Sequence, residues 1–134
     1  MKLDIAPSVA AALASRRPVV ALESTVIAHG LPRPLNLQTA REMEEIVRVA
    51  GATPATIALA DGAAVVGADA ALLARLANED GVAKVSLRDL APVLARRGLG
   101  ATTVAATVEI SARAGISVMA TGGIGGVHRG AERS

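Results

Sequence analysis

The sequence predicts a layered α/β/α fold, in which helices cover a mostly parallel sheet that carries one inserted β-hairpin. Short apolar runs of strand type alternate along the 134 residues with longer segments of helical periodicity. This alternation is typical of parallel sheets with crossover helices. Apolar residues make up 51% of the chain, enough for a packed core. The length suits one domain or part of one.

The first elements are set by proline and by apolar runs. Residues 7–16 predict a short helix that Pro18 stops. Val19–Leu22 is a short apolar run, as expected of a strand covered on both faces. The segment Ala28–Pro34 is rich in glycine and proline and predicts an irregular loop.

A longer helix is expected to begin near Asn36 or Thr39, because Thr39 and Glu42 have the spacing of a capping box. Gly51 stands where a C-terminal cap belongs. The helix carries one apolar stripe, formed by Leu37, Ala40, Met43, Ile46, Val47 and Ala50.

Asp61-Gly62 separates the apolar runs 55–60 and 63–66 and is the strongest hairpin signal in the chain. Asp69 follows and can cap a helix. That helix would carry Leu72, Leu73 and Leu76 on its apolar side.

The second half of the chain repeats the alternation. Residues 82–85 predict a strand, and a helix follows around 90–96. Gly100-Ala101-Thr102-Thr103 is expected to open a further helix that runs to about Ala114. The last strand is expected over 116–120.

Composition argues against a nucleic-acid-binding role. The chain has no Phe, Tyr or Trp, so it offers no aromatic platform on which bases could stack. The net charge is +2, and the basic residues are scattered, with pairs only at Arg16-Arg17 and Arg96-Arg97. Each pair lies near an expected helix end, where cations suit the helix dipole.

The same composition suggests a cytoplasmic protein without a membrane segment. There is no cysteine, which fits a reducing compartment. The start carries Asp4 and no long apolar core, unlike a signal peptide. No apolar stretch reaches the length of a membrane span.

Polar side chains follow the expected strands, where α/β folds gather their ligands. Glu23 ends an apolar strand and could serve as a general acid, the alternative being a structural salt bridge. Lys84 has a similar place and could meet a phosphate, the alternative being a solvated edge. Thr102 and Thr103 could cap a helix or leave amides near Val104 facing an anion.

A glycine-rich segment follows the last expected strand, with five glycines between Gly122 and Gly130. Its backbone amides could approach an anion closely, and the alternative is a flexible connection. The segment matches neither a dinucleotide fingerprint nor a P-loop. It also holds His128, for which a binding role and a plain surface position both stay open.

Five sequence blocks together resemble the pseudouridine-5′-phosphate glycosidase family, also called the indigoidine synthase A family. They lie in the order and spacing of that family, from about Pro18 to Glu132. The blocks are ALESTVIAHG (21–30), PATIA (54–58), KVSLRDL (84–90), GATTVAAT (100–107) and TGGIGGVHRGAE (121–132).

The resemblance implies an enzyme of nucleoside catabolism, a glycosidase of the hydrolase or lyase class. Such enzymes reversibly cleave the C–C glycosidic bond of pseudouridine 5′-phosphate to give uracil and ribose 5-phosphate. The family opens the ribose ring and attaches it to a lysine as an imine, which provides an electron sink. A divalent metal, usually Mn²⁺, helps to polarise the uracil.

By motif, the resemblance makes Glu23 the proton donor and acceptor. Lys84, the Val104 backbone and His128 would contact the substrate, largely its phosphate. It also implies that the assembly is a homo-oligomer, typically a trimer.

One departure from the family pattern is large. The family's metal-binding Asp, a Ser-Ala-Asp segment and the imine-forming lysine would follow the last block, and the chain ends at Ser134. Its only lysines are Lys2 and Lys84. We therefore expect residues 1–134 to be a single partial domain, the N-terminal portion of the family fold, and inactive alone. Two alternatives stay open, a non-catalytic sugar-phosphate-binding module and a non-functional gene fragment.

Overall fold

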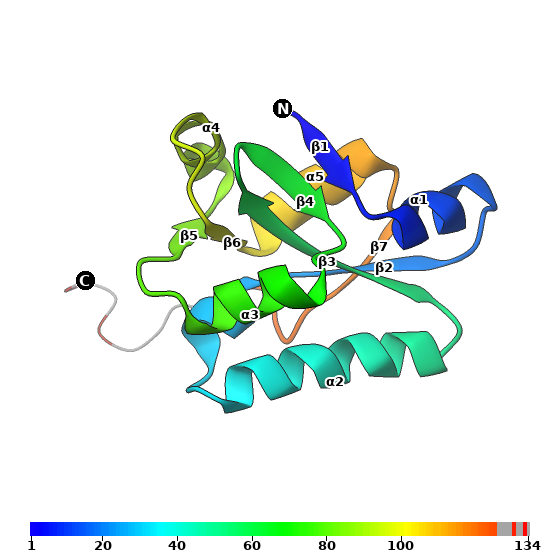
Figure 1. Cartoon of the computed structure of the whole chain (residues 1–134), viewed down its shortest axis with the longest axis horizontal. Helices are drawn as coiled ribbons and strands as arrows, with labels where there is room; N and C mark the ends of the chain where they lie inside the picture. Colours follow the sequence, from blue (N-terminus) through cyan, green and yellow to red (C-terminus); the bar gives the residue numbers. More distant parts are fainter. Residues whose placement is uncertain (126–129, 131–132, 134) are drawn as a thin grey trace.

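The computed structural model describes residues 1–125, 130 and 133, and it shows the predicted α/β/α layers (Figure 1). The strands are β1 (Leu3–Ile5), β2 (Val19–Leu22), β3 (Thr53–Ala60), β4 (Ala63–Val66), β5 (Ala83–Val85), β6 (Gly100–Thr102) and β7 (Val118–Ala120). The helices are α1 (Pro7–Ala14), α2 (Leu35–Val49), α3 (Ala70–Asn78), α4 (Leu90–Ala95) and α5 (Val104–Ala114), with a π-helical turn at Val26–Gly30 and a 3₁₀ turn at Leu87–Asp89.

The seven strands form one sheet in the order β1-β4-β3-β2-β7, to which β6 and β5 are joined through β3. Four neighbouring pairs are parallel, and only β3–β4 and β3–β6 are antiparallel. The mostly parallel sheet is thus confirmed. The predicted hairpin is β3–β4, and its turn residues Asp61 and Gly62 have φ values of 51° and 84°, as a two-residue hairpin turn requires.

Helices cover the two faces of the sheet with separate cores. On one face α1, α4 and α5 contribute fully buried residues such as Val9, Val93 and Ile110. On the other face α2 and α3 pack with residues such as Ala40 and Leu76. Figure 1 shows α2 and α3 together below the sheet. Within residues 1–125, no helix is both long and apolar enough to cross a lipid bilayer.

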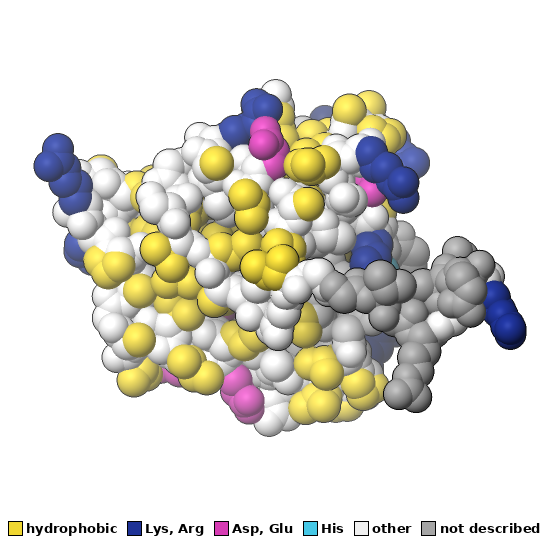
Figure 2. All heavy atoms as spheres, turned by 180° about the vertical axis from the view of Figure 1, so that it is seen from behind, with side chains coloured by type: hydrophobic (Ala, Val, Ile, Leu, Met, Phe, Trp, Pro, Cys, Tyr) yellow, Lys and Arg dark blue, Asp and Glu magenta, His cyan; other side chains and the backbone are white. Residues whose placement is uncertain are grey.

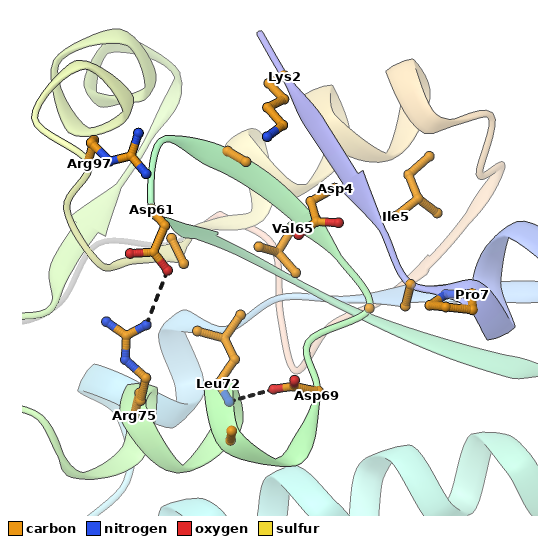
Figure 3. Close-up of a pocket in the computed structure, with 15 residues that line it drawn as sticks. Lys2, Asp4, Ile5, Pro7, Asp61, Val65, Asp69, Leu72, Arg75 and Arg97 are labelled. Carbon is orange, nitrogen blue, oxygen red and sulfur yellow. Dashed lines mark hydrogen bonds and ion pairs between the residues drawn. The ribbon is translucent and has the colours of Figure 1, made fainter.

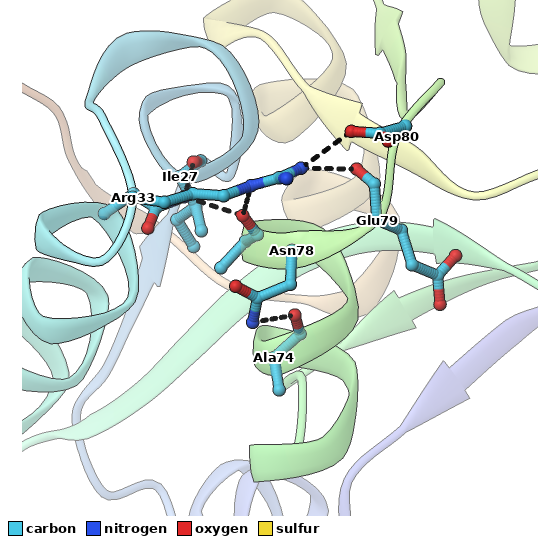
Figure 4. Close-up of polar contacts among 8 residues, drawn as sticks. Ile27, Arg33, Ala74, Asn78, Glu79 and Asp80 are labelled. Carbon is cyan, nitrogen blue, oxygen red and sulfur yellow. Dashed lines mark hydrogen bonds and ion pairs between the residues drawn. The ribbon is translucent and has the colours of Figure 1, made fainter.

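The loop before α2 is tied to the end of α3 (Figure 4). The Ala77 carbonyl accepts hydrogen bonds from Arg33 Nε and from Asn36 Nδ2, both at 2.9 Å. Arg33 Nη2 also reaches the Glu79 carbonyl at 3.2 Å and Asp80 Oδ1 at 3.1 Å. These bonds satisfy carbonyl groups that the last turn of a helix leaves without intrahelical partners.

The start of α2 corrects the expected capping box. The helix begins at Leu35, so Thr39 lies inside it and caps nothing. Asn36 is instead buried and donates to the Ile27 and Ala77 carbonyls, so tertiary contacts fix where the helix starts. The predicted stripe is also wrong in part, because Ile46 is 68% exposed.

Two short strands were missed. Residues 100–102, expected to open a helix, form strand β6, and the helix begins only at Val104. Pairing with β3 and β5 on both sides holds Gly100–Thr102 extended, which its own composition does not favour. Leu3–Ile5 pairs with β4 as an edge strand that the sequence did not indicate. The loop expected over 28–34 begins within the π-helical turn Val26–Gly30.

Asp69 caps α3 as predicted, since its Oδ1 accepts a hydrogen bond from the Leu72 amide at 2.7 Å. We expect Asp69→Ala to lower the free energy of unfolding by about 1 kcal/mol, because a first-turn amide loses its acceptor. Urea denaturation followed by circular dichroism measures this. Asp69→Ser should restore most of the loss, and an equal loss in both variants would contradict a capping role.

Candidate functional site

Four strands end close to one point, halfway along β3. β2 runs beside Thr53–Thr56 of β3, while β6 runs in the opposite direction beside Ala58 and Leu59. The carboxyl ends of β2 and β6 therefore face each other at Ile57. β5 lies parallel to β6, and β7 lies parallel to β2, so their carboxyl ends reach the same region (Figure 1). This meeting point is the geometric basis of the candidate site.

A fully buried network of hydroxyl groups holds the two strand ends together. Ser24 Oγ donates to the Ile57 carbonyl at 2.6 Å and accepts from the Thr102 amide at 2.8 Å. Thr102 Oγ1 also donates to the Ile57 carbonyl, at 2.9 Å, and accepts from Thr107 Oγ1 at 2.8 Å. Ser24, Thr102 and Thr107 are 0% exposed. The network fixes the residues that follow β2 and the start of α5 relative to each other.

Glu23 lies at this meeting point, half-buried, and joins β2 to β7. Its Oε1 accepts a hydrogen bond from Thr121 Oγ1 at 2.6 Å. Both residues line a groove of about 390 Å³, which Leu22, Val26 and Met43 bound with apolar side chains. A carboxyl group held at the mouth of an apolar groove, next to the glycine-rich segment, is placed for proton transfer.

The other predicted site residues lie around the same point to different degrees. Val104 is the first residue of α5, and Thr103 does not cap the helix with its side chain, so the first amides face outward without an intrahelical partner. Lys84 lies on β5, next to Val85, which pairs with Thr102. Its side chain is exposed and makes no hydrogen bond or ion pair within the described part of the chain. His128 lies outside the described residues.

Two further hydroxyl groups lie at the site, and their burial without a partner was not predicted, although Thr103 was considered as a helix cap. The Oγ1 atoms of Thr25 and Thr103 are buried and have no hydrogen-bond partner among residues 1–125, 130 and 133. Each follows one of the facing strands, β2 or β6. A signal was available in the repeated pattern of a strand followed by hydroxyl residues, Glu23-Ser24-Thr25 and Thr102-Thr103. Buried hydroxyls without partners are unusual and can serve a bound polar group.

A second cavity, of about 540 Å³, lies away from this point, beside the hairpin and β1 (Figure 3). Lys2, Asp4 and Arg97 line this cavity. Arg75 and Asp61 also line it and form an ion pair, with 3.6 Å between Nη1 of Arg75 and Oδ2 of Asp61. The hydrogen bond from Arg75 to Glu79 raises the pKa of the Arg75 guanidinium above its usual value, so Arg75 stays charged. None of the predicted site residues Glu23, Lys84 and Val104 lines this cavity, and we place the candidate site at Glu23.

The described residues contain no group of three His, Cys, Asp or Glu side chains that could hold a metal ion. Glu23 is the only carboxylate lining its groove among these residues. The described residues therefore do not fit a bound Mn²⁺, and no chemical step is assigned to a metal here.

Comparison with known proteins adds a consistent set of relatives. Residues 8–134 match the family model described as indigoidine synthase A like protein. A protein from Jannaschia sp. named pseudouridine-5′-phosphate glycosidase is 59% identical over 98% of this chain, which spans 44% of that protein. One of the same name from Salinispora tropica is 62% identical over 94% of this chain and 39% of its own length.

Two solved structures share the fold. The prealnumycin C-glycosynthase AlnA, solved in complex with ribulose 5-phosphate, matches 99% of this chain and 43% of its own, with a TM-score of 0.85 and 50% identity. An indigoidine synthase A-like protein from Thermotoga maritima matches 84% of this chain and 38% of its own, with a TM-score of 0.77 and 42% identity. The chain thus spans about two fifths of the length of these proteins.

Proposed function

Because this chain belongs to the indigoidine synthase A-like family, we propose that it carries part of a pseudouridine-5′-phosphate glycosidase site, at which uracil and ribose 5-phosphate are separated reversibly. The observation that carries the proposal is the position of Glu23, held by Thr121 where four strand ends meet. The relatives named above, at 59% and 62% identity, support the choice of substrate.

In this proposal Glu23 moves the proton. When the C–C bond breaks, its electron pair stays with the uracil carbon, and the Glu23 carboxyl group supplies the proton that this carbon takes up. In the reverse direction the carboxylate removes the proton. Thr121 keeps Oε1 of Glu23 at the mouth of the groove.

The phosphate is bound, in the same proposal, by Lys84 and by the free amides at the start of α5, near Val104. Lys84 is available for this because its side chain is exposed and makes no ion pair or hydrogen bond within the described residues. His128 completes the substrate contacts. The complex of AlnA with ribulose 5-phosphate supports a sugar phosphate as the ligand class.

Four further expectations belong to the same proposal. The 134 residues form a single partial domain of the family fold, which acts in the cytoplasm. The active assembly is a homotrimer, and Mn²⁺ takes part through ligands other than the described residues. Neither Lys2 nor Lys84 lies in the sequence motif that holds the imine-forming lysine in the family that this chain resembles.

Binding of ribose 5-phosphate tests the phosphate site. We expect calorimetry to show binding to the 134-residue chain, weakened about tenfold or more by Lys84→Ala, because one charge-assisted hydrogen bond is worth about 1.5–3 kcal/mol. Lys2→Ala removes the only other lysine, which lines the distant cavity, and should leave the affinity unchanged. No heat of binding, or equal effects of the two variants, would contradict the proposal.

The same chain distinguishes catalysis from binding alone. A non-catalytic sugar-phosphate module is favoured by the single lysine near the site, which leaves no separate lysine for an imine. Incubation with pseudouridine 5′-phosphate, followed by chromatography for uracil, separates the two functions. Since the chain is expected to be inactive alone, we expect ribose 5-phosphate binding without uracil release, and uracil release that disappears in Glu23→Gln would show a glycosidase that needs no further residues.

A further inference from the structure

One face of the molecule exposes apolar side chains from a helix and a strand that line one groove together. We call it the α2–β7 surface and define it by Met43, Ile46 and Val49 of α2 and by Val118 and Ala120 of β7. Ile46, Val49 and Val118 are 68%, 79% and 56% exposed. Figure 2, which views the side opposite to Figure 1, shows several patches of hydrophobic side chains on that face. Exposed apolar surfaces of this kind usually mark an interface.

The two parts of this surface are separated by a groove that both elements line. Met43, Ile46 and Val47 form one wall, and Leu22 and Ala120 lie on the other side. It is the same groove, of about 390 Å³, that Glu23 and Thr121 line, so this surface borders the candidate site.

The outer face of α2 has its own helical periodicity. Its inner face buries Asn36, Ala40 and Glu44, spaced by four residues. Met43, Ile46 and Ala50 recur at three and four residues and belong to the apolar stripe that the sequence analysis described. The helix α2 therefore exposes apolar side chains such as Ile46 and Val49 that the described part of the chain does not cover.

β7 adds an open strand edge. It pairs only with β2 in the described part of the chain, so its other edge has no strand partner there. The edge strand at the opposite end, β1, is flanked by Lys2 and contains Asp4, and such charges discourage pairing. β7 contains Val118, Met119 and Ala120 and has no charged side chain. Its edge is therefore suited to accept a further strand.

We propose that the α2–β7 surface docks the polypeptide that completes the family fold in the longer relatives, with one of its strands added to the open edge of β7. AlnA shares this fold over 99% of the present chain, which accounts for only 43% of AlnA. The larger remainder of such a protein must pack on the shared part, and this surface offers an uncharged strand edge beside an apolar groove. A second copy of this chain would offer the same short, three-residue strand and is a less extensive partner.

The test uses the 134-residue chain and, as probe, the part of the Jannaschia relative that follows its matched segment. Both are co-expressed, and complex formation is measured by native mass spectrometry and by titration. We expect a one-to-one complex whose affinity falls at least tenfold in Ile46→Asp and in Val118→Asp. Val108→Asp serves as the matched control, because Val108 is 52% exposed on α5, outside this surface. The affinity of this variant for the probe should stay within twofold of that of the unmodified chain.

If the separate probe does not fold, the same proposal is tested with a single-chain fusion in which the probe is joined after residue 125. Hydrogen exchange of residues 118–120 should slow at least tenfold in the fusion relative to the 134-residue chain. Ile46→Asp should lower the melting temperature of the fusion and leave that of the 134-residue chain unchanged.

Three results would overturn the proposal. These are unchanged exchange at β7 in the fusion, equal affinity of the surface variants and the control, or a dimer of the 134-residue chain that Ile46→Asp dissociates. None of these measurements depends on turnover, so a failure of the proposed glycosidase function leaves the docking test intact.

Discussion

Gly67→Ala is expected to lower the free energy of unfolding by about 2–5 kcal/mol, the sum of a backbone and a packing penalty. Gly67 has a φ of 97°, where a residue with a Cβ is strained by about 1–2 kcal/mol. A Cβ there would lie 2.8 Å from the Cβ of Ala6 and 2.9 Å from Cγ2 of Val9. Val9 is fully buried in the core, so the contact forces an overpacking cost of about 1–3 kcal/mol.

Gly51→Ala is the matched control for this prediction. Gly51 has a φ of 87°, but a Cβ there would meet no atom within 4 Å. The control should therefore cost only the backbone part, about 1–2 kcal/mol. Chemical denaturation of both variants isolates the packing part as their difference. Equal losses would show that the segment between β4 and α3 moves away from α1 at no cost.

The elements that depend on local sequence signals could be predicted from the sequence. The turn Asp61-Gly62, the cap Asp69 and the apolar run Val19–Leu22 each depend on chemistry within a few residues, and each is found where it was predicted. β6 was missed because its extended conformation comes from β3 and β5, residues distant in sequence. The helix α2 begins at Leu35, next to Asn36, so the alternative start at Thr39 was wrong, because the contact of Asn36 with the end of α3 is not visible in the local sequence.

The candidate site was foreseen as a set of strand ends, but its geometry was not. Sequence order suggested one common edge of a parallel sheet. The structure instead brings β2 and β6 together from opposite directions at Ile57, because β3 pairs with both along one edge. No pattern within the chain specifies that Ser24 and Thr102, 78 residues apart, share one carbonyl. Roles for Glu23, Lys84 and Val104 stay predictions that the binding experiments test.

Ser24→Ala is expected to lower the free energy of unfolding by about 2–4 kcal/mol. The substitution removes the hydrogen bond to the Ile57 carbonyl and leaves the buried Thr102 amide without the acceptor that now lies at 2.8 Å. The lost bond to the Ile57 carbonyl costs about 1 kcal/mol, and the Thr102 amide left as an unsatisfied buried donor costs about 1–3 kcal/mol. Thermal and urea unfolding of the variant measure the loss.

Ser111→Ala supplies the control, because Ser111 is also buried, at 4% exposure, but its Oγ has no hydrogen-bond partner among the described residues. Removing a hydroxyl that bonds to nothing should change stability by less than about 0.5 kcal/mol. If Ser24→Ala were equally neutral, the hydroxyl network would not be what joins β2 to β6. A large loss confined to Ser24 would instead show that the hydroxyl network next to Glu23 is what holds the ends of β2 and β6 together.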